Sequence, residues 1–496
     1  MTRSLEHPSE HSDRSREGLM PDAFIDATGQ AELVRRNEIT PGELVEETLA
    51  RIGKIDPQLN SVVVTLADKA RAEAENAPDG PFRGVPYLLK EVMPSKGDIY
   101  AAGIKGVIAA GLRADHDTYF VEAMRAAGFV LAGRSNTSEM ALVATTESAG
   151  WGVCRNPWDT SRSTGGSSGG AAAAVAAGLV PVAHGSDGGG SVREPAAKCG
   201  VVGLKPTRGR VSQGPQVIDS DNVSGMAHEG WMTRSVRDCA ALLDVTGGHR
   251  PGDAFGAWAP PGPFAAEVGA DPGRLRIGVL TEDPTGQTAV DPECAAAARA
   301  VADVLAGLGH DVRDGFPEVL RQGSWPMEFM PCVGVVVLRE IERFGRLVGR
   351  PLSEDDMEPQ TWAYTEVGRT VTGVQYAAGV DALRERGREI ERWWADDGWD
   401  LLLTPTLTGQ TPPLGLFKPT KEDPFSSLGM EASAFTVPFN VTGQPAISLP
   451  LHWAADGMPI GVQFGAAHGR EDVLIRVASQ LEAAMPWTGR IPPVHA

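Results

Sequence analysis

The region that most restricts the fold of this chain is residues 161–200, where Gly, Ser and Ala dominate. Two Gly/Ser segments lie in it, TGGSSGG at residues 164–170 and GSDGGGSVR at residues 185–193. The residues between them are rich in Ala and suit a buried helix that brings the two segments together. Glycine runs are conformationally costly, so they occur where the backbone must approach another group closely. A flexible loop would explain one such segment better than it explains two so close together.

The second segment has the composition of a site for acyl transfer. Its three glycines, residues 188–190, precede Ser191 and leave backbone N–H groups unobstructed beside that hydroxyl. Such donors can stabilise the negative charge that develops on a carbonyl oxygen during acyl transfer. A serine hydroxyl is a weak nucleophile, however, and needs a base to remove its proton. The segment therefore predicts a nucleophile whose base lies elsewhere in the chain.

Strand and helix patterns alternate along the rest of the chain, which predicts an α/β fold with a mixed central sheet covered by helices on both faces. No repeat or long linker divides the pattern, so we expect one large domain over residues 23–490. The polar residues 1–22 have no apolar core and predict a disordered tail. The clearest elements are a capped helix from residue 40, strands at 85–89, 275–280, 399–404 and 445–450, helices at 291–308 and 471–484, and a mainly helical section at 319–395.

Composition excludes several classes of function. With 45 Lys and Arg against 64 Asp and Glu, the net charge is −19, which disfavours nucleic acid and anionic membranes as partners. The longest apolar run, residues 171–183, is shorter than the ~20 residues of a spanning helix. The five cysteines form no C-x-x-C pair and predict reduced, buried thiols in a cytoplasmic protein. The ten histidines include no H-E-x-x-H, so we expect no metal.

Several segments together resemble the amidase-signature family. They are GVPYLLK at residues 84–90, GGSSGG at 165–170, GSDGGGSVR at 185–193, GLKPT at 203–207, TRSVRD at 233–238 and GQPA at 443–446. The resemblance spans nearly the whole chain from about residue 24. It implies the fold of that family, hydrolysis of an amide through an acyl-enzyme, and no organic cofactor. A homodimer is also favoured by chain size and by the habit of the family.

The resemblance implies a Ser–cis-Ser–Lys triad, in which Lys90 is the base, Ser167 the relay and Ser191 the nucleophile. It also implies a cis peptide bond before Ser167 and an oxyanion hole formed by the N–H groups of Gly188, Gly189 and Gly190, with that of Ser191. The chemistry is reasonable on physical grounds. A lysine in water is protonated near neutral pH, but burial at the end of an apolar strand lowers its pKa into a usable range. Outside this motif, Lys90 would be interpreted as a surface lysine.

Three positions depart from the family pattern. Gly188 stands where a larger residue is usual, Glu194 where an apolar residue is usual, and Lys198 where an aromatic one is frequent. Glu194 is unexpected in the packing behind the nucleophile, and Lys198 is expected to be solvated. Asp187 and Arg193, which flank the glycines, are expected to brace the turn without touching substrate.

The identity of the amide stays open at this point. Residues 84–90, 113–120, 219–230, 249–253 and 435–440 resemble hydrolases of cyclic amides such as the 6-aminohexanoate cyclic dimer. An amidase of linear aliphatic or aryl amides, or the glutaminase subunit of a tRNA-dependent amidotransferase, are the alternatives. Specificity is expected to reside in residues 319–395, where Cys332 and Trp362 are candidate contacts.

A different mechanism would follow from the G-x-S-x-G pattern at residues 165–169, which is also the nucleophile elbow of α/β-hydrolases. That mechanism requires a downstream histidine, for which His452 or His468 could be offered. Neither has a distinctive sequence setting, and Lys90 and the second Gly/Ser segment would be left without a role.

Overall fold

The computed structural model describes residues 22–215, 225–322 and 325–496, with the backbone alone over residues 325–329. Of the tail for which disorder is predicted, residues 1–22, only Asp22 lies within the described part. The domain predicted for residues 23–490 has no internal boundary in the pattern of packing, because a single sheet runs through it.

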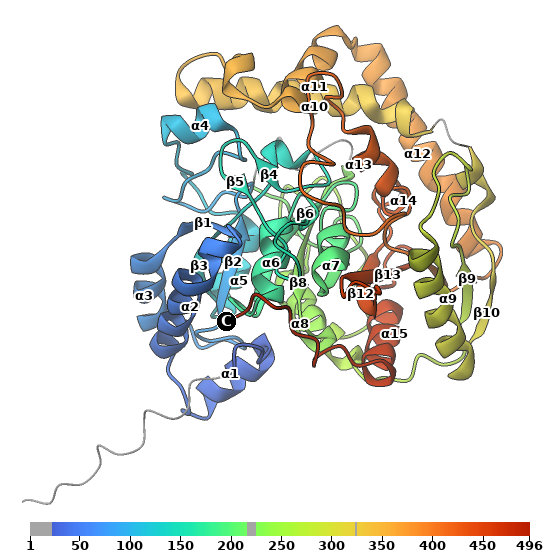
Figure 1. Cartoon of the computed structure of the whole chain (residues 1–496), viewed down its shortest axis with the longest axis horizontal. Coiled ribbons are helices and arrows are strands. Elements are labelled where there is room, and N and C mark those ends of the chain that lie inside the picture. Colours follow the sequence, from blue (N-terminus) through green and yellow to red (C-terminus); the bar gives the residue numbers. More distant parts are fainter. Residues whose placement is uncertain (1–21, 216–224, 323–324) are drawn as a thin grey trace, which may run out of the picture.

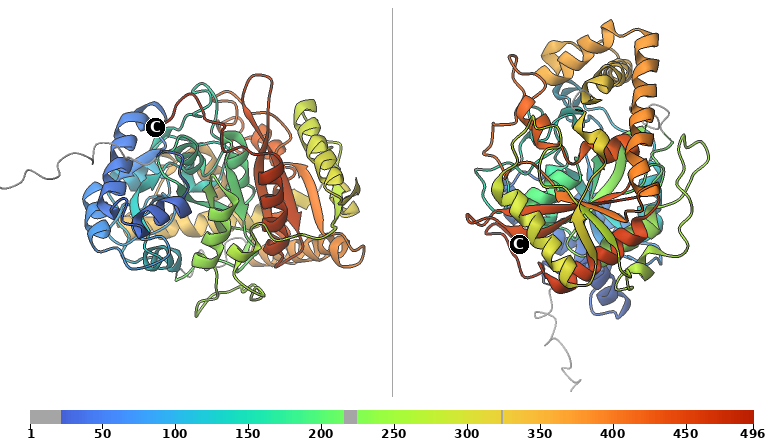
Figure 2. Two further views of the ribbon diagram at one scale, coloured as in Figure 1. Left: turned by 90° about the horizontal axis from the view of Figure 1, so that it is seen from below. Right: turned by 90° about the vertical axis from the view of Figure 1, so that its right-hand side faces the viewer.

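An 11-stranded mixed sheet forms the centre of the fold, in the order β1-β3-β2-β6-β8-β7-β12-β13-β11-β9-β10. Strands β2, β3 and β6 are parallel, as are β9, β10 and β11, and the pairs between these groups are antiparallel. The strands fan out with a strong twist (Figure 2). Their bounds are β1 (Val62–Thr65), β2 (Pro86–Lys90), β3 (Val130–Ser135), β6 (Val182–Asp187), β7 (Val202–Lys205), β8 (His228–Thr233), β9 (Arg276–Val279), β10 (Asp311–Asp314), β11 (Leu401–Pro405), β12 (Ala446–Trp453) and β13 (Pro459–Ala466), and a separate ribbon pairs β4 (Glu147–Ser148) with β5 (Gly152–Val153).

Helices cover both faces of this sheet, which confirms the predicted architecture. On one face pack α5 (Tyr119–Ala126), α8 (Val236–Thr246), α9 (Pro292–Gly307) and α15 (Glu471–Ala484). On the other face pack α6 (Gly169–Ala176), α7 (Arg193–Cys199), α12 (Gly373–Ala395) and α14 (Val437–Thr442). Helix α6 is made of Gly, Ala and Val and every residue in it is buried, so it can lie directly against the sheet. This close packing holds the two Gly/Ser segments next to each other.

The outer helices complete the fold. Helix α2 (Pro41–Ile55) starts at the predicted capping box, in which Thr40 and Glu43 exchange hydrogen bonds. At the other side, α10 (Trp325–Val348) and α11 (Pro359–Thr370) pack together, and with α12 they arch over one end of the sheet (Figure 1). This arch confirms the helical section predicted for residues 319–395. The remaining helices are α1 (Ala27–Arg35), α3 (Ala67–Glu75), α4 (Lys105–Ala110) and α13 (Ser427–Ala432).

The structure departs from the sequence pattern at one place. Residues 134–139 are rich in polar side chains, a composition typical of a loop, but Arg134 and Ser135 belong to β3 and are fully buried. Arg134 can be buried there because its guanidinium donates to the backbone oxygens of Lys90 and Met93. For this nitrogen of the guanidinium, hydrogen bonds to the end of β2 and the loop after it replace hydration.

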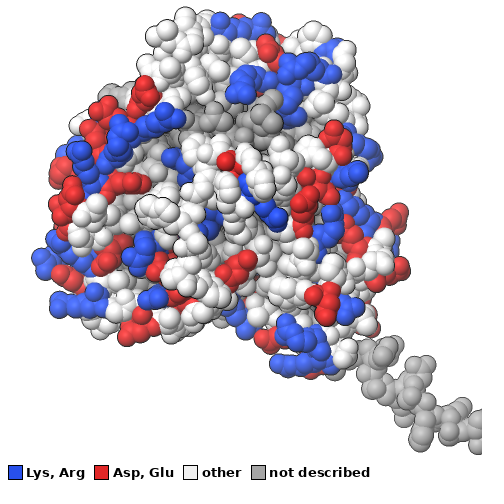
Figure 3. Space-filling view, turned by 180° about the vertical axis from the view of Figure 1, so that it is seen from behind, with Lys and Arg blue, Asp and Glu red and all other residues white. Residues whose placement is uncertain are grey.

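The cysteines lie as expected from composition, since all five are free and buried. None of the helices in the described ranges is long and apolar enough to cross a membrane. On the face shown in Figure 3, acidic and basic side chains are interspersed.

Candidate active site

Lys90 lies at the carboxyl end of β2, where the apolar strand has carried it out of contact with water. Its side chain is fully buried. The ammonium nitrogen lies 2.7 Å from the hydroxyl of Ser167 and 3.0 Å from the hydroxyl of Ser186. Burial lowers the pKa of Lys90 to about 7, against the opposing effect of the nearby carboxylates of Glu229 and Asp187. At neutral pH a large share of the molecules therefore carries Lys90 as a free amine.

Ser167 stands at the junction between the first Gly/Ser segment and α6. The peptide bond between Gly166 and Ser167 is cis, as the resemblance implies. A Cβ on Gly166 would lie 2.4 Å from the backbone nitrogen of Thr145, so only glycine fits. The backbone N–H of Ser168 donates to the carbonyl of Ser191 at 3.3 Å, which ties the two Gly/Ser segments together directly.

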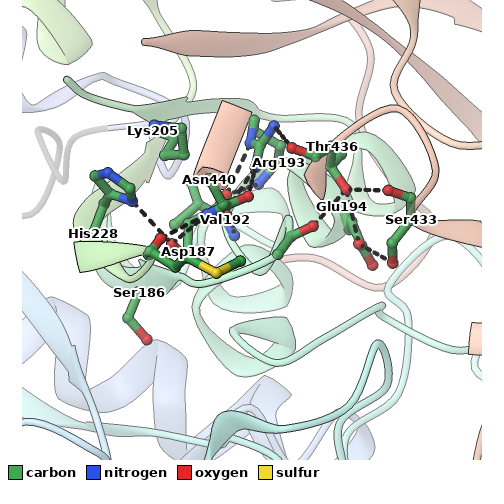
Figure 4. A network of polar contacts seen from close by, with 12 residues as sticks. Ser186, Asp187, Val192, Arg193, Glu194, Lys205, His228, Ser433, Thr436 and Asn440 are labelled. Carbon is green, nitrogen blue, oxygen red and sulfur yellow. Dashed lines mark hydrogen bonds and ion pairs between the residues drawn. The ribbon is translucent and has the colours of Figure 1, made fainter. Parts of the chain in front are cut away.

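The turn that carries Ser191 is fixed by a buried ion pair between Asp187 and Arg193. The guanidinium donates to both carboxylate oxygens, at 2.8 and 2.9 Å, and neither side chain is exposed. Burial alone would raise the pKa of Asp187, but the charge and hydrogen bonds of Arg193 hold it well below its usual range. Asn440 bonds to both partners (Figure 4). Asp187 and Arg193 therefore brace the glycine turn, as expected.

Of the three glycines in this turn, only Gly190 is required by space. Its φ is +140°, and a Cβ there would lie 2.4 Å from a carboxyl oxygen of Glu194 and 2.5 Å from the hydroxyl of Thr436. At Gly188 and Gly189 a Cβ would meet nothing closer than 3.8 and 3.6 Å. Both of these residues line the open side of the turn together with Ser191. A glycine at position 188, where a larger residue is usual, thus leaves the pocket side of the turn open. It does not disturb the part of the turn held by Asp187 and Arg193.

A pocket of about 550 Å³ opens in front of the two serines Ser167 and Ser191. Residues of α10 and α11, including Val333, Val337 and Tyr364, contribute apolar side chains to its wall. Among the described residues that line the pocket there is no Lys, Arg or His. Five lining residues carry carboxyl groups, namely Glu194, Glu229, Asp283, Glu340 and Glu431.

The comparisons with known proteins agree with this geometry. The model of the family described as Amidase matches residues 43–475. The chain belongs to the amidase family. The 6-aminohexanoate-cyclic-dimer hydrolase of Paenarthrobacter ureafaciens is 56% identical over 479 residues, which cover 95% of this chain and 97% of that protein.

Solved structures place this amidase with the same enzymes. A structure of 6-aminohexanoate cyclic dimer hydrolase complexed with substrate superposes with a TM-score of 0.93 at 55% identity, covering 96% of this chain and all of that one. A bacterial aryl acylamidase of the amidase-signature family gives 0.84 at 26% identity, covering 95% and 99%. This protein is therefore an amidase-signature amidohydrolase that acts on a small-molecule amide.

The expectation for Lys198 is wrong. Lys198 is buried and not solvated, and its nitrogen lies 4.8 Å from the centre of the Phe417 ring. Burial lowers its pKa, and the carboxyl group of Glu194 one turn earlier on α7 partly offsets that effect. Phe417 is 219 residues further along the chain, so no local pattern could indicate that the two would pack together.

Glu194 is accommodated behind the nucleophile by hydroxyl groups. One of its carboxyl oxygens accepts a hydrogen bond from Ser433 at 2.6 Å and a longer one from Thr436. The hydroxyl of Thr436 also lies 2.6 Å from the carbonyl of Gly189 (Figure 4). The Glu194 side chain therefore links α7 by hydrogen bonds to the segment before α14, whereas an apolar side chain would only fill space.

The candidate contacts in the helical section are not on the pocket wall. Cys332 is fully buried and packs with Val380 and Leu383 of α12. Trp362 packs against the cluster around Phe344. Neighbouring residues of α10 and α11 line the pocket instead, so the predicted section borders the pocket although these two residues do not. Nor does a histidine serve the G-x-S-x-G pattern, since the partner of Ser167 is Lys90.

We expect Arg193→Met to lower the free energy of unfolding by about 3–5 kcal/mol, because it leaves the Asp187 carboxylate buried and unpaired. Urea unfolding followed by fluorescence measures the change. The control is Arg36→Met, which removes an ion pair to Glu32 whose side chains are 64% and 39% exposed. That variant should lose no more than about 0.5 kcal/mol. Equal losses in the two variants would contradict the bracing role.

Proposed function

We propose that this amidase cleaves its substrate through an acyl-enzyme on Ser191, with Ser167 as relay and Lys90 as base. The observation that carries the proposal is the 2.7 Å contact between the Lys90 nitrogen and the Ser167 hydroxyl, made by a lysine whose pKa is about 7. Ser191 lines the same pocket as Ser167, on a turn whose backbone is hydrogen-bonded to Ser168.

In the proposed reaction Ser191 attacks the amide carbon while its proton passes through Ser167 to Lys90. The N–H groups of Gly188, Gly189 and Gly190 are the proposed donors to the oxyanion. When the C–N bond breaks, Lys90 returns the proton through Ser167 to the leaving nitrogen, which departs as an amine. Water then attacks the ester by the same route, giving the acid and restoring Ser191.

We further propose that the substrate is a neutral cyclic amide of the size of the 6-aminohexanoate cyclic dimer. The two most similar proteins described above carry that name, and the match covers almost the full length of both chains. The pocket supports the same choice, since apolar walls suit the methylene chains of such a ring. Carboxyl groups on the wall, with no Lys, Arg or His among the described lining residues, disfavour an anionic substrate.

The same observation disfavours the glutaminase alternative. Glutamine presents a carboxylate next to its ammonium group, and recognition of a carboxylate uses Arg or Lys. Neither lines the pocket within the described part of the chain. A linear aliphatic or aryl amide, in contrast, would meet no charge conflict and remains the second candidate.

A substrate panel tests this proposal. The wild-type enzyme is given the 6-aminohexanoate cyclic dimer, the linear dimer of the same unit, a neutral alkyl amide, an anilide and glutamine, and amine release is followed. We expect the cyclic dimer to have the highest kcat/KM. We expect the linear dimer and glutamine, which carry carboxylates, to fall below it by about 100-fold or more. A preference for either of these two carboxylate-bearing substrates would contradict the proposed substrate class.

A further inference from the structure

Glu229 is a carboxylate that faces the Lys90 end of the pocket and has no part in the triad. It lies on β8 directly opposite Ser186 of β6 in the antiparallel register. Ser186 in turn contacts the Lys90 nitrogen at 3.0 Å and points away from the Asp187–Arg193 network (Figure 4). The Glu229 side chain lines the pocket beside Ser167 and Ser186 and is 12% exposed. Sheet pairing therefore holds a carboxylate close to the buried amine.

The hydrogen-bond partner of Glu229 does not neutralise it. His184, two residues before Ser186 on β6, contacts the carboxylate at 2.8 Å through Nε2. Burial of the imidazole lowers the pKa of His184, so the ring is neutral at neutral pH and donates its N–H to Glu229. The negative charge of Glu229 is oriented by this bond and stays available to Lys90.

The other charged groups around Lys90 are already engaged. Asp187 is paired with Arg193. Glu91 accepts hydrogen bonds from the backbone N–H groups of Ala101 and Gly103 and from Trp151. The ionisable groups next to Lys90 in the sheet are Arg134 of β3, His184 and Asp187 of β6, Glu229 of β8, and Glu91, which directly follows Lys90 in the chain. Of the three carboxylates in this set, Glu229 is the one without a cationic or multiple backbone partner of its own.

We propose that Glu229 is a positioning residue for the charge on Lys90: its carboxylate stabilises the ammonium that forms when Lys90 takes the proton of Ser191. The inference rests on the triad proposed above. Proton transfer to Lys90 creates a positive charge in a fully buried place, and such a charge is costly unless a counter-charge is near. Glu229 supplies that counter-charge without contacting the substrate carbonyl, and the proton itself moves only between Ser191, Ser167, Lys90 and the leaving nitrogen.

The test is the pH profile of kcat/KM for Glu229→Gln, measured on the best substrate of the panel. Glutamine keeps the shape and the hydrogen bond to His184 but removes the charge. Loss of a nearby negative charge lowers the proton affinity of Lys90, so the acidic limb should move to lower pH by about 1 unit. The plateau at high pH should fall about three- to tenfold, because the base is weaker.

Two further variants make the result decisive. Glu229→Asp keeps the charge and should leave the limb within a few tenths of a unit of wild type. Glu75→Gln removes an exposed carboxyl group from α3, which is not among the residues that line the pocket, and should move neither limb nor plateau. If Glu229→Gln folds, as judged by its thermal unfolding, and its limb stays in place, the inference is wrong. A limb that moves equally in Glu229→Asp would also contradict it, because the shift would then follow from altered packing. Should Ser191→Ala remain active, the triad itself would be at fault, which is a separate outcome.

Discussion

Ser191→Ala is expected to lose amide hydrolysis by about 10³- to 10⁶-fold in kcat, since it removes the hydroxyl proposed to form the acyl-enzyme. Binding should persist, because the pocket walls and the braced turn are unchanged. The experiment compares amine release by wild type and variant, and then quenches each reaction with acid for mass spectrometry of the intact protein. Wild type should show a covalent adduct of the mass of the acyl group, and the variant none.

Ser161→Ala is the control for this experiment. Ser161 is exposed and its hydroxyl donates to Asp159, outside the pocket, so its loss should leave both rate and adduct as in wild type. Full activity in Ser191→Ala would contradict the proposed nucleophile. An adduct that moved to another residue would contradict it as well.

The second large effect is expected for Lys90→Met, which keeps the length of the side chain and removes the amine. We expect kcat/KM to fall by about 10²- to 10⁴-fold, the usual contribution of a general base. The wild-type rate should rise with pH through a limb near 7, because Lys90 is inactive when protonated and burial brings its pKa to about that value. That limb should disappear in Lys90→Met.

Rates measured between pH 5 and 9 test the effect on wild type, Lys90→Met and Lys54→Met. Lys54 is exposed on α2 and its loss should alter neither the rate nor the limb. A limb that persists unchanged in Lys90→Met would assign the titration to another group and would remove Lys90 as the base.

Local features of the sequence were sufficient to predict much of this molecule. The strand that ends at Lys90 follows from an uninterrupted apolar run, and the capping box at Thr40 fixed the start of α2. The closing helix α15 has the bounds expected from its periodicity. The order of the motifs then indicated the family and the three candidate triad positions. The structure brings two of these residues, Lys90 and Ser167, into contact.

What the sequence could not predict depends on contacts between distant segments. The burial of Lys198 depends on Phe417, and the position of Glu229 beside Lys90 depends on the pairing of β6 with β8. Asn440 reaches Asp187 across 253 residues. A lone Glu, Asn or Lys in such places has no periodic pattern around it, so its environment is decided only when the sheet is assembled.

The carboxyl groups on the pocket wall have a consequence for how the catalytic cycle ends. Hydrolysis converts an uncharged amide into an acid, and the new negative charge arises at the floor of a pocket lined by Glu194, Glu229 and three further acidic residues. Like charges in a partly desolvated space repel, so we expect the new carboxylate to be held less tightly than the uncharged amide group from which it forms. Accumulated product would then be a poor inhibitor. The reverse condensation of acid and amine would be slow, because little acid would be bound at the site.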